Sequence, residues 1–196
     1  MTDTAQRKGD RTRQSLIDAA IVRFAREGYR GTSVADVGRD AGLSTTAAYP
    51  YFANKEALFV AAVDEDVAGL IDDAVSLVGL ESDQHWGRTL MRNLIDRLAA
   101  YPLARRIVSG LEPDFTMRLL GIPALEQLRK GVAEFMRALQ VTGEVRADVD
   151  PDPMASGIVV IVISLLMASV QTGAAGFETI ASDVETVLDA ATRPPI

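Results

Sequence analysis

The spacing of apolar residues predicts helices along the whole chain. From residue 11 to residue 27 the apolar positions recur every three or four residues, which is the period of one helix face, and Gly28 follows as a helix stop. Asn54 is a good N-cap for a longer helix. No alternating strand pattern of useful length occurs, so we expect an all-α fold. Further helices are expected at about 55–78, 83–100, 102–110, 113–120, 123–140, 151–173 and 177–192.

Two short helices are expected before Asn54. Ser33 and Asp36 have the spacing of a capping box and predict a helix start near residue 32. Gly42 supplies the left-handed turn that would end this helix. Ser44 is a good N-cap for the next short helix. Pro50 should end that helix early because proline has no backbone N–H, so we expect an altered third helix.

The segment at 157–170 is apolar nearly all round. With about 14 residues it is short for crossing a bilayer, and we expect no membrane segment. A helix without a polar face needs cover on all sides. We therefore expect one side to face the chain's own core and the other to face a second copy. Burial within a single chain is the alternative.

Charge is distributed unevenly along the 196 residues, although the net charge is -7. Residues 1–60 carry 9 Lys and Arg against 7 Asp and Glu, and the remainder carries 11 against 20. A basic cluster near the N-terminus is either a solvated tail or an arm that touches a polyanion. We expect a cytoplasmic protein, since no apolar stretch follows the charged N-terminus. The cluster consists of Arg7, Lys8, Arg11 and Arg13.

Residues 32–59, TSVADVGRDAGLSTTAAYPYFANKEALF, carry the clearest motif. Two short helices joined by a tight turn at Gly42 and Leu43 have the arrangement of a helix-turn-helix. The stretch resembles the TetR family of transcriptional repressors at many fixed positions, and the resemblance extends upstream to residue 16. The matching residues are Thr32, Val37, Gly38, Ala41, Gly42, Leu43, Ser44, Tyr49, Phe52, Lys55 and Leu58.

The resemblance implies two domains and a function. Residues 1–55 would form the helix-turn-helix domain with a basic N-terminal arm, and residues 56–196 a helical regulatory and dimerisation domain. The protein would be a homodimeric repressor that binds a palindromic operator in double-stranded DNA and is released by a small-molecule effector. No cofactor, metal or catalytic residue is expected, because one His, no Cys and no Gly-rich phosphate loop leave little for catalysis.

Two other functions stay open. The chain could be a helix-turn-helix protein that acts through protein partners without specific DNA binding. Least favoured is an α-helical enzyme, whose only acidic candidates, among them Asp64, Asp66 and Asp73, have the spacing of a solvated helix face.

Candidate DNA contacts come from the helix-turn-helix and the residues that follow it. Hydroxyl groups and backbone N–H groups at a helix start can bind phosphate, and tyrosine hydroxyls and a lysine can add to this. Threonine and alanine methyl groups can touch a thymine methyl but fix no single base, so groove shape and the basic arm are expected to contribute. The candidates are Thr32, Ser33, Ser44, Thr45, Thr46, Ala47, Tyr49, Tyr51 and Lys55.

Candidate effector contacts are aromatic and methionine side chains beyond residue 80. Such side chains can shape an adaptable apolar cavity, although ordinary core packing is the alternative for each. The lone His85 is not expected to bind a metal, since no second His or Cys completes a site. The candidates are Trp86, Met91, Tyr101, Phe115, Met117, Phe135 and Met136.

Overall fold

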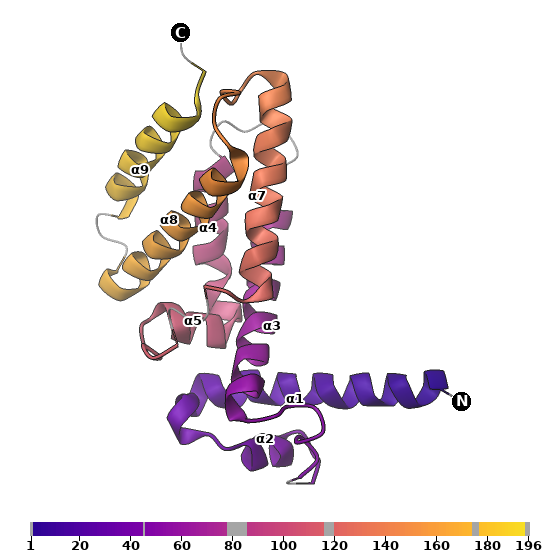
Figure 1. The fold of residues 1–196 in the computed structure, drawn as a ribbon. Helices are drawn as coiled ribbons and strands as arrows, with labels where there is room; N and C mark the ends of the chain where they lie inside the picture. Colours follow the sequence, from indigo (N-terminus) through magenta and orange to yellow (C-terminus); the bar gives the residue numbers. More distant parts are fainter. Residues whose placement is uncertain (1, 45, 78–85, 116–119, 174–176, 195–196) are drawn as a thin grey trace.

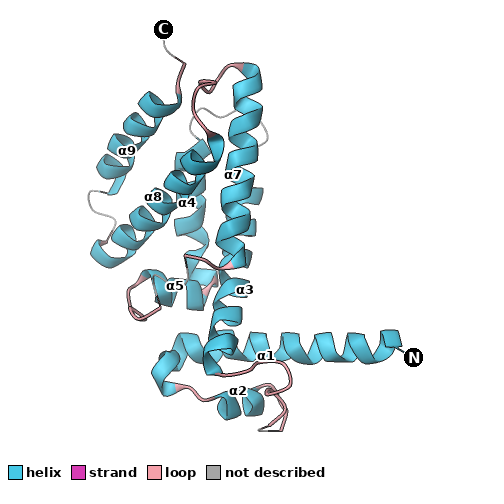
Figure 2. Cartoon of the chain, viewed as in Figure 1, coloured by secondary structure: helices cyan, strands magenta, loops and turns pink. Residues whose placement is uncertain are grey.

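The described part of the chain is entirely helices, turns and loops (Figure 1, Figure 2). This computed structural model describes residues 2–44, 46–77, 86–115, 120–173 and 177–194. The prediction of an all-α fold is confirmed. The helices are α1 (Thr2–Gly31), α2 (Val34–Asp40), α3 (Lys55–Ser76), α4 (Trp86–Arg97), the 3-10 turn η1 (Leu98–Ala100), α5 (Pro102–Val108), α7 (Pro123–Thr142), α8 (Pro151–Thr172) and α9 (Phe177–Thr192).

Helix α3 connects a small lower unit to a larger upper bundle (Figure 1). In the lower unit α1 lies across the molecule above α2, and its first turns project beyond everything else (Figure 1). The upper bundle places α7 against α8, with α4 behind and α9 at the side (Figure 1). Two apolar clusters form the core, one around Phe24 and Phe59 below and one around Met136 and Val159 above. Helix α3 contributes residues to both clusters, so it connects the two units through their cores.

Helix starts follow the capping residues seen in the sequence. Ser33 and Asp36 form the capping box of α2, each side chain accepting from the other's backbone N–H. The Asn54 side chain accepts from the Ala57 N–H at 2.8 Å and begins α3. Gly42 has φ 70°, the left-handed conformation expected after α2. These three predictions are confirmed.

Two carboxylates of α3 cap neighbouring helices. Asp66 accepts from the N–H groups of Leu103 and Ala104, at 2.9 and 2.7 Å, where α5 begins. Asp64 accepts from the Ala124 N–H at 2.9 Å, where α7 begins. Asp66 is buried, so the expectation of a fully solvated acidic face is wrong at this position. Burial raises the pKa of Asp66, and the two N–H donors partly offset that rise.

Helix α1 begins earlier than its apolar period indicated. It starts at Thr2 instead of residue 11, because the polar residues before residue 11 continue the helix without contributing to the core. The predicted stop at Gly28 is present as a break in the backbone, with φ 73° and ψ 173°. The helix expected at 113–120 is wrong for residues 113–115 and 120, which form turns, and its other residues lie outside the described part.

Helix α8 is long and apolar enough to cross a membrane by length and composition alone, a test that a core helix of a globular protein also passes. Only 33% of its most apolar window is buried within the single chain. Helices α4, α5, α7 and α9 all contact α8, with α7 contacting it most extensively, and much of its remaining apolar surface is exposed.

Candidate nucleic-acid interface

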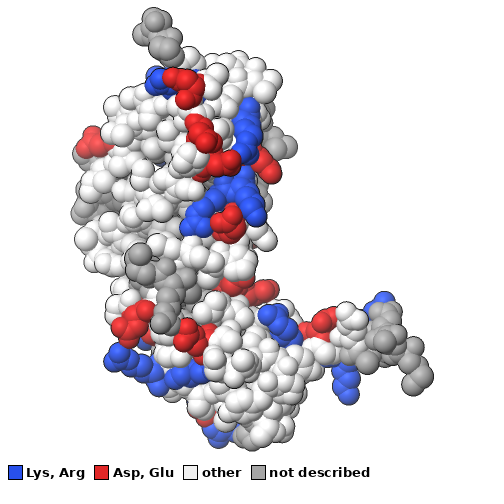
Figure 3. Space-filling model, in the orientation of Figure 1, with Lys and Arg blue, Asp and Glu red and all other residues white. Residues whose placement is uncertain are grey.

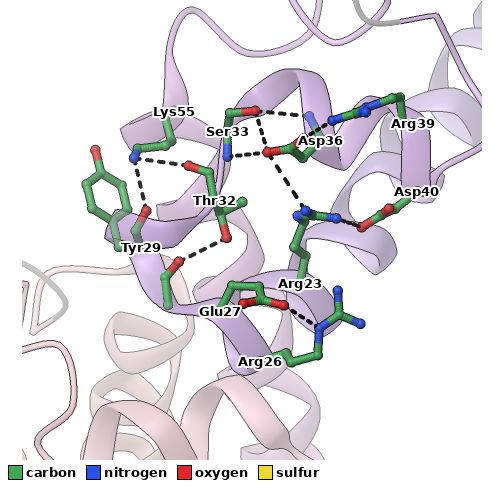
Figure 4. Close-up of polar contacts among 11 residues, drawn as sticks. Arg23, Arg26, Glu27, Tyr29, Thr32, Ser33, Asp36, Arg39, Asp40 and Lys55 are labelled. Atoms are coloured by element: carbon green, nitrogen blue, oxygen red, sulfur yellow. Dashed lines mark hydrogen bonds and ion pairs between the residues drawn. The ribbon is translucent and has the colours of Figure 1, made fainter.

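Helix α2 is fixed on α1 by a small polar network (Figure 4). The Ser33 hydroxyl donates to the Asp36 carboxylate at 2.7 Å, and this bond is the main cause of a lowered Asp36 pKa. Arg23 of α1 pairs with Asp40 at 2.7 Å and lies 3.8 Å from Asp36. Val37 is completely buried beneath this network. The first helix of the motif is thus held by both polar and apolar contacts.

The segment after α2 is a run of turns, so the predicted third α-helix is wrong for its described residues. The Ala47 N–H donates to the Ser44 carbonyl at 3.0 Å, and the Tyr49 N–H to the Thr46 carbonyl at 3.3 Å. Both hydrogen bonds join residues three apart in the chain, which is typical of 3-10 turns. Pro50 has no N–H to offer the Thr46 carbonyl, which an α-helix would require.

Two buried side chains anchor this recognition segment, which we define as residues 44–52. Ala48 is fully buried, and Phe52 is 4% exposed in the lower core. Both the Tyr51 and the Phe52 N–H groups donate to the Ala48 carbonyl at 3.0 Å. Small Ala48 lets the segment lie close to the core, while Tyr49 and Pro50 between the anchors are exposed.

The structure brings five of the predicted DNA contacts together on the recognition segment. Ser44 and Thr46 are exposed, and Tyr49 is 57% exposed. Ala47 and Tyr51 are half-buried, with Tyr51 packed on the lower core. Thr45 lies outside the described residues.

Thr32 and Ser33 have structural roles in this fold. Thr32 is 3% exposed, and its hydroxyl donates to the Gly28 carbonyl at 2.9 Å. The Ser33 hydroxyl belongs to the capping box of α2. Both hydroxyls are thus engaged within the fold, and the DNA contacts of Thr32 and Ser33 stay predictions.

Lys55 is also used inside the fold (Figure 4). Its ammonium donates to the backbone carbonyls of Tyr29 at 2.9 Å and Thr32 at 3.1 Å, and lies 4.2 Å from the centre of the Tyr29 ring. A lysine in the first turn of a helix is unfavourably placed for the helix dipole, which was the signal in the sequence for a compensating partner. In the described structure the ammonium therefore clamps α3 to the end of α1, and the phosphate contact of Lys55 stays a prediction.

The basic cluster lies on the projecting part of α1, where Lys and Arg side chains are visible (Figure 3). It is therefore a helical arm. The Arg13 guanidinium lies 5.3 Å from the centre of the Phe52 ring, a cation–π contact that the sequence did not reveal. This contact ties the arm to one anchor of the recognition segment.

In the upper bundle, a partly open cavity lies between α4, α7, α8 and α9. Of the predicted effector contacts, Met91 and Met136 line it. Its volume of about 100 Å³ is below the roughly 300–1,000 Å³ of most ligand pockets. Arg88 of α4 and Glu185 of α9 form an ion pair at its wall. The other lining residues are Gly87, Leu139, Val145, Ile158, Ile161, Val162, Leu165, Val184, Leu188, Asp189 and Thr192.

The remaining effector candidates lie elsewhere. Phe115 packs on Tyr29 in the lower core, with ring centres 4.4 Å apart, because the chain after α5 returns to α1. Phe135 is on the outer side of α7 and 38% exposed. Neither side chain lines the cavity between α4, α7, α8 and α9. Met117 and the Trp86 side chain lie outside the described residues.

Tyr101 lies where α3, η1 and α5 meet, away from the cavity lining. A Cβ atom on Gly69 would come within 2.7 Å of its ring, so this glycine allows the close approach. Burial, followed by a hydrogen bond to Asp73, raises the pKa of Tyr101 to about 12. In this structure Tyr101 packs against Gly69, and its effector contact stays a prediction. No group of three or more His, Cys, Asp or Glu in the described residues is placed to hold a metal ion.

Comparison with known proteins agrees with this geometry. The profile of "Bacterial regulatory proteins, tetR family" matches residues 16–62. Transcriptional regulator AcuR of Cereibacter sphaeroides is 30% identical over 153 residues, which cover 72% of this chain and 68% of that protein. The HTH-type transcriptional repressor KstR2 of Rhodococcus jostii is 38% identical over 71 residues, 36% of this chain and 32% of the relative.

Solved structures share the fold over nearly the whole chain. A TetR-family transcriptional regulator from Pectobacterium atrosepticum superimposes with a TM-score of 0.72 at 23% identity, covering 95% of this chain and 97% of that one. A regulator from Mesorhizobium loti superimposes with a TM-score of 0.68 at 23% identity, covering 94% of this chain and 98% of that one. This chain belongs to the TetR family and is a DNA-binding transcriptional regulator.

Proposed function

We propose that the protein is a repressor that binds a palindromic operator as a homodimer in the cytoplasm and is released by a small-molecule effector. The observation that carries this is the recognition segment, which presents exposed polar side chains from a rigidly capped helix-turn-helix. We keep residues 1–55 as the DNA-binding domain and residues 56–196 as the regulatory and dimerisation domain.

The proposed DNA contacts are narrower than the sequence suggested. Ser44 and Tyr49 would donate to phosphate, and Thr46 with Ala47 would approach base edges. Tyr51, half-buried, would add its hydroxyl at the margin, and Thr45 stays in the set by its position in the sequence. The helical arm with Arg7, Lys8 and Arg11 would add charge beside the recognition segment, supplying the salt-dependent part of affinity. Lys55 is omitted because its ammonium already holds two carbonyls.

A second copy would cover the open side of α8, together with α9. The side of the molecule that carries these helices is largely free of charge (Figure 3). Apolar side chains exposed there include Val160 at 45%, Ile180 at 51% and Val187 at 66%. Exposed Gly157, Ser164 and Ala168 on α8 allow close helix approach. A homodimer with this face at its centre would bury the surface without a membrane.

The effector would enter the cavity between α4 and α9. Most of its lining is apolar, which favours a ligand with an apolar body. Because the cavity is small, α4 and α9 would have to separate and break the Arg88–Glu185 pair as the ligand enters. The ligand would favour the released state only if it binds that state more tightly.

The test is binding of labelled DNA selected from a random pool by the purified protein. We expect a palindromic site, dimers in sedimentation, and affinity that falls steeply with salt. Tyr49→Phe should weaken binding to all DNA about equally, while Thr46→Val should change the preference among sequences. A protein that enriches no sequence and binds no DNA at low salt would instead act through protein partners, which would overturn the proposal.

A further inference from the structure

A buried carboxylate joins the regulatory domain to the end of α1. Glu112 follows α5 in the chain and is 8% exposed. Its Oε1 accepts from the backbone N–H of Tyr29 at 3.0 Å and from Arg106 Nε at 2.7 Å. Arg106 also reaches the Ala25 carbonyl, at 3.4 Å. One ion pair of the regulatory domain therefore holds the backbone on both sides of the break in α1.

Gly28 makes this contact possible. Its φ of 73° lies in the left-handed region, and with ψ 173° the conformation is essentially restricted to glycine. A Cβ atom here would lie 2.4 Å from Arg106 Nη2 and 2.8 Å from Glu112 Oε1. The break in α1 is thus shaped to receive the ion pair.

The same short piece of backbone is also held by Lys55, which binds the carbonyls of Tyr29 and Thr32. The residues from Gly28 to Ser33 lead directly into α2. Their path sets the direction in which the helix-turn-helix leaves the bundle. Of the two charged groups that hold them, Glu112 is the one that belongs to the regulatory part of the chain.

We infer that Glu112 is a positioning residue that sets the angle of the helix-turn-helix relative to the dimerisation helices, and hence the half-site separation that the dimer accepts. The inference rests on the proposed dimeric DNA binding. Two heads held at a fixed angle fit one separation of major grooves, whereas loosely held heads fit several.

The position of Glu112 is linked to the upper bundle through α5. Asp66 of α3 caps the start of α5, and Gln171 near the end of α8 donates to the Val108 carbonyl at its other end, at 2.9 Å. Helix α8 lines the cavity and carries the proposed dimer face. A shift of α8 would therefore displace α5 and Glu112 together, moving the segment that leads into α2.

The test compares half-site separations. Operators derived from the wild type's selected site are lengthened and shortened one base pair at a time and titrated with wild-type protein, Glu112→Gln and Asp114→Asn. Asp114 is the matched control, because its ion pair with Arg30 also joins the two domains. The Asp114 side chain is 66% exposed and the Arg30 side chain 88% exposed, so this pair contributes little to holding them. Arg106→Lys is the second variant if Glu112→Gln is poorly folded. It keeps the positive charge but loses the planar guanidinium that bonds both Glu112 and the Ala25 carbonyl.

We expect the wild type and Asp114→Asn to prefer one separation by about tenfold or more, and Glu112→Gln to reduce that preference to about threefold or less. Preference among sequences within each half-site should stay unchanged, which a general loss of stability would not produce. A Glu112→Gln or Arg106→Lys protein with the wild-type separation profile would overturn the inference and leave the proposed function standing. Failure of the wild type to select any DNA would refute the proposed function itself.

Discussion

Replacing Lys55 with methionine tests whether this lysine holds the fold or the DNA. The change keeps most of the apolar stem and removes the ammonium that binds two carbonyls and lies over the Tyr29 ring. Hydrogen bonds to a charged group contribute about 1.5–3 kcal/mol each, and the lower end applies to a half-buried lysine. A cation–π contact adds about 0.5–1 kcal/mol.

The side-chain entropy of an ordered lysine offsets these gains by about 1.5–2 kcal/mol. We therefore expect Lys55→Met to lower the free energy of unfolding by about 2 kcal/mol. The measurement is urea denaturation of wild type and variant at one protomer concentration, because dimer stability depends on concentration. Lys55→Arg should lower the free energy of unfolding by less, since arginine keeps a charged hydrogen-bond donor.

Arg11→Met is the matched control for charge. Arg11 is exposed on the helical arm, so its loss should leave the free energy of unfolding unchanged and reduce the salt dependence of DNA binding. The reasoning on Lys55 is refuted if Lys55→Met unfolds like the wild type and instead reduces the slope of log affinity against log salt by about one. Lys55 would then be a phosphate contact, as the sequence alone suggested.

Further predictions concern the contacts of Gly28, Asp66 and Tyr101. Gly28→Ala should lower the free energy of unfolding by about 2 kcal/mol or more in urea, from backbone strain and the displaced Arg106–Glu112 pair. Asp66→Ala should lower it by about 1–2 kcal/mol, because the start of α5 loses its cap. Since the folded pKa of Asp66 is raised, its contribution is fullest below its unfolded pKa and is lost as pH rises through the folded value. Asp66→Asn should thus gain stability relative to wild type as pH rises above about 4, the ordinary pKa of an aspartate. For Tyr101, a pKa of about 12 predicts a late step in the tyrosinate absorbance titration that is absent from Tyr101→Phe.

Each of these has a clear contrary result. A Gly28→Ala protein as stable as wild type would mean that the break in α1 is not constrained by the ion pair. A constant stability difference between Asp66→Asn and wild type across that pH range would show that burial does not raise this pKa. The stability held by the protonated Tyr101 is present below about pH 10 and lost as pH rises toward 12, so an early titration would contradict its burial.

The helices that the sequence predicted well are those whose ends carry local signals. Ser33, Asn54 and Gly42 act through their own backbone neighbourhood, so their roles are readable without tertiary contacts. The start of α1 was missed because polar residues can extend a helix with no apolar period. The missing N–H of Pro50 was readable from the sequence, but the expected shortened helix was wrong, because the described residues before Pro50 also form turns with hydrogen bonds between residues three apart.

Site residues were harder to assign than helices, because a polar side chain at a family position can serve the fold instead. The Thr32 hydroxyl binds the Gly28 carbonyl four residues before it, whereas the Lys55 ammonium binds carbonyls 26 and 23 residues away. Phe115 joined the lower core because the chain returns to α1 after α5. Glu112 carried no sequence signal for its long-range contact: its ion-pair partner Arg106 is six residues away, but the Tyr29 N–H that it accepts from is 83 residues away, beside the break at Gly28.

The most direct test of the account is the binding of purified protein to the DNA that it selects, with random DNA as competitor at low and high salt. The account predicts saturable binding of a dimer that survives the competitor, weakens steeply with salt and loses affinity in Tyr49→Phe. Binding that the competitor abolishes, or that occurs equally with any sequence, would contradict the claim that the recognition segment directs this protein to an operator.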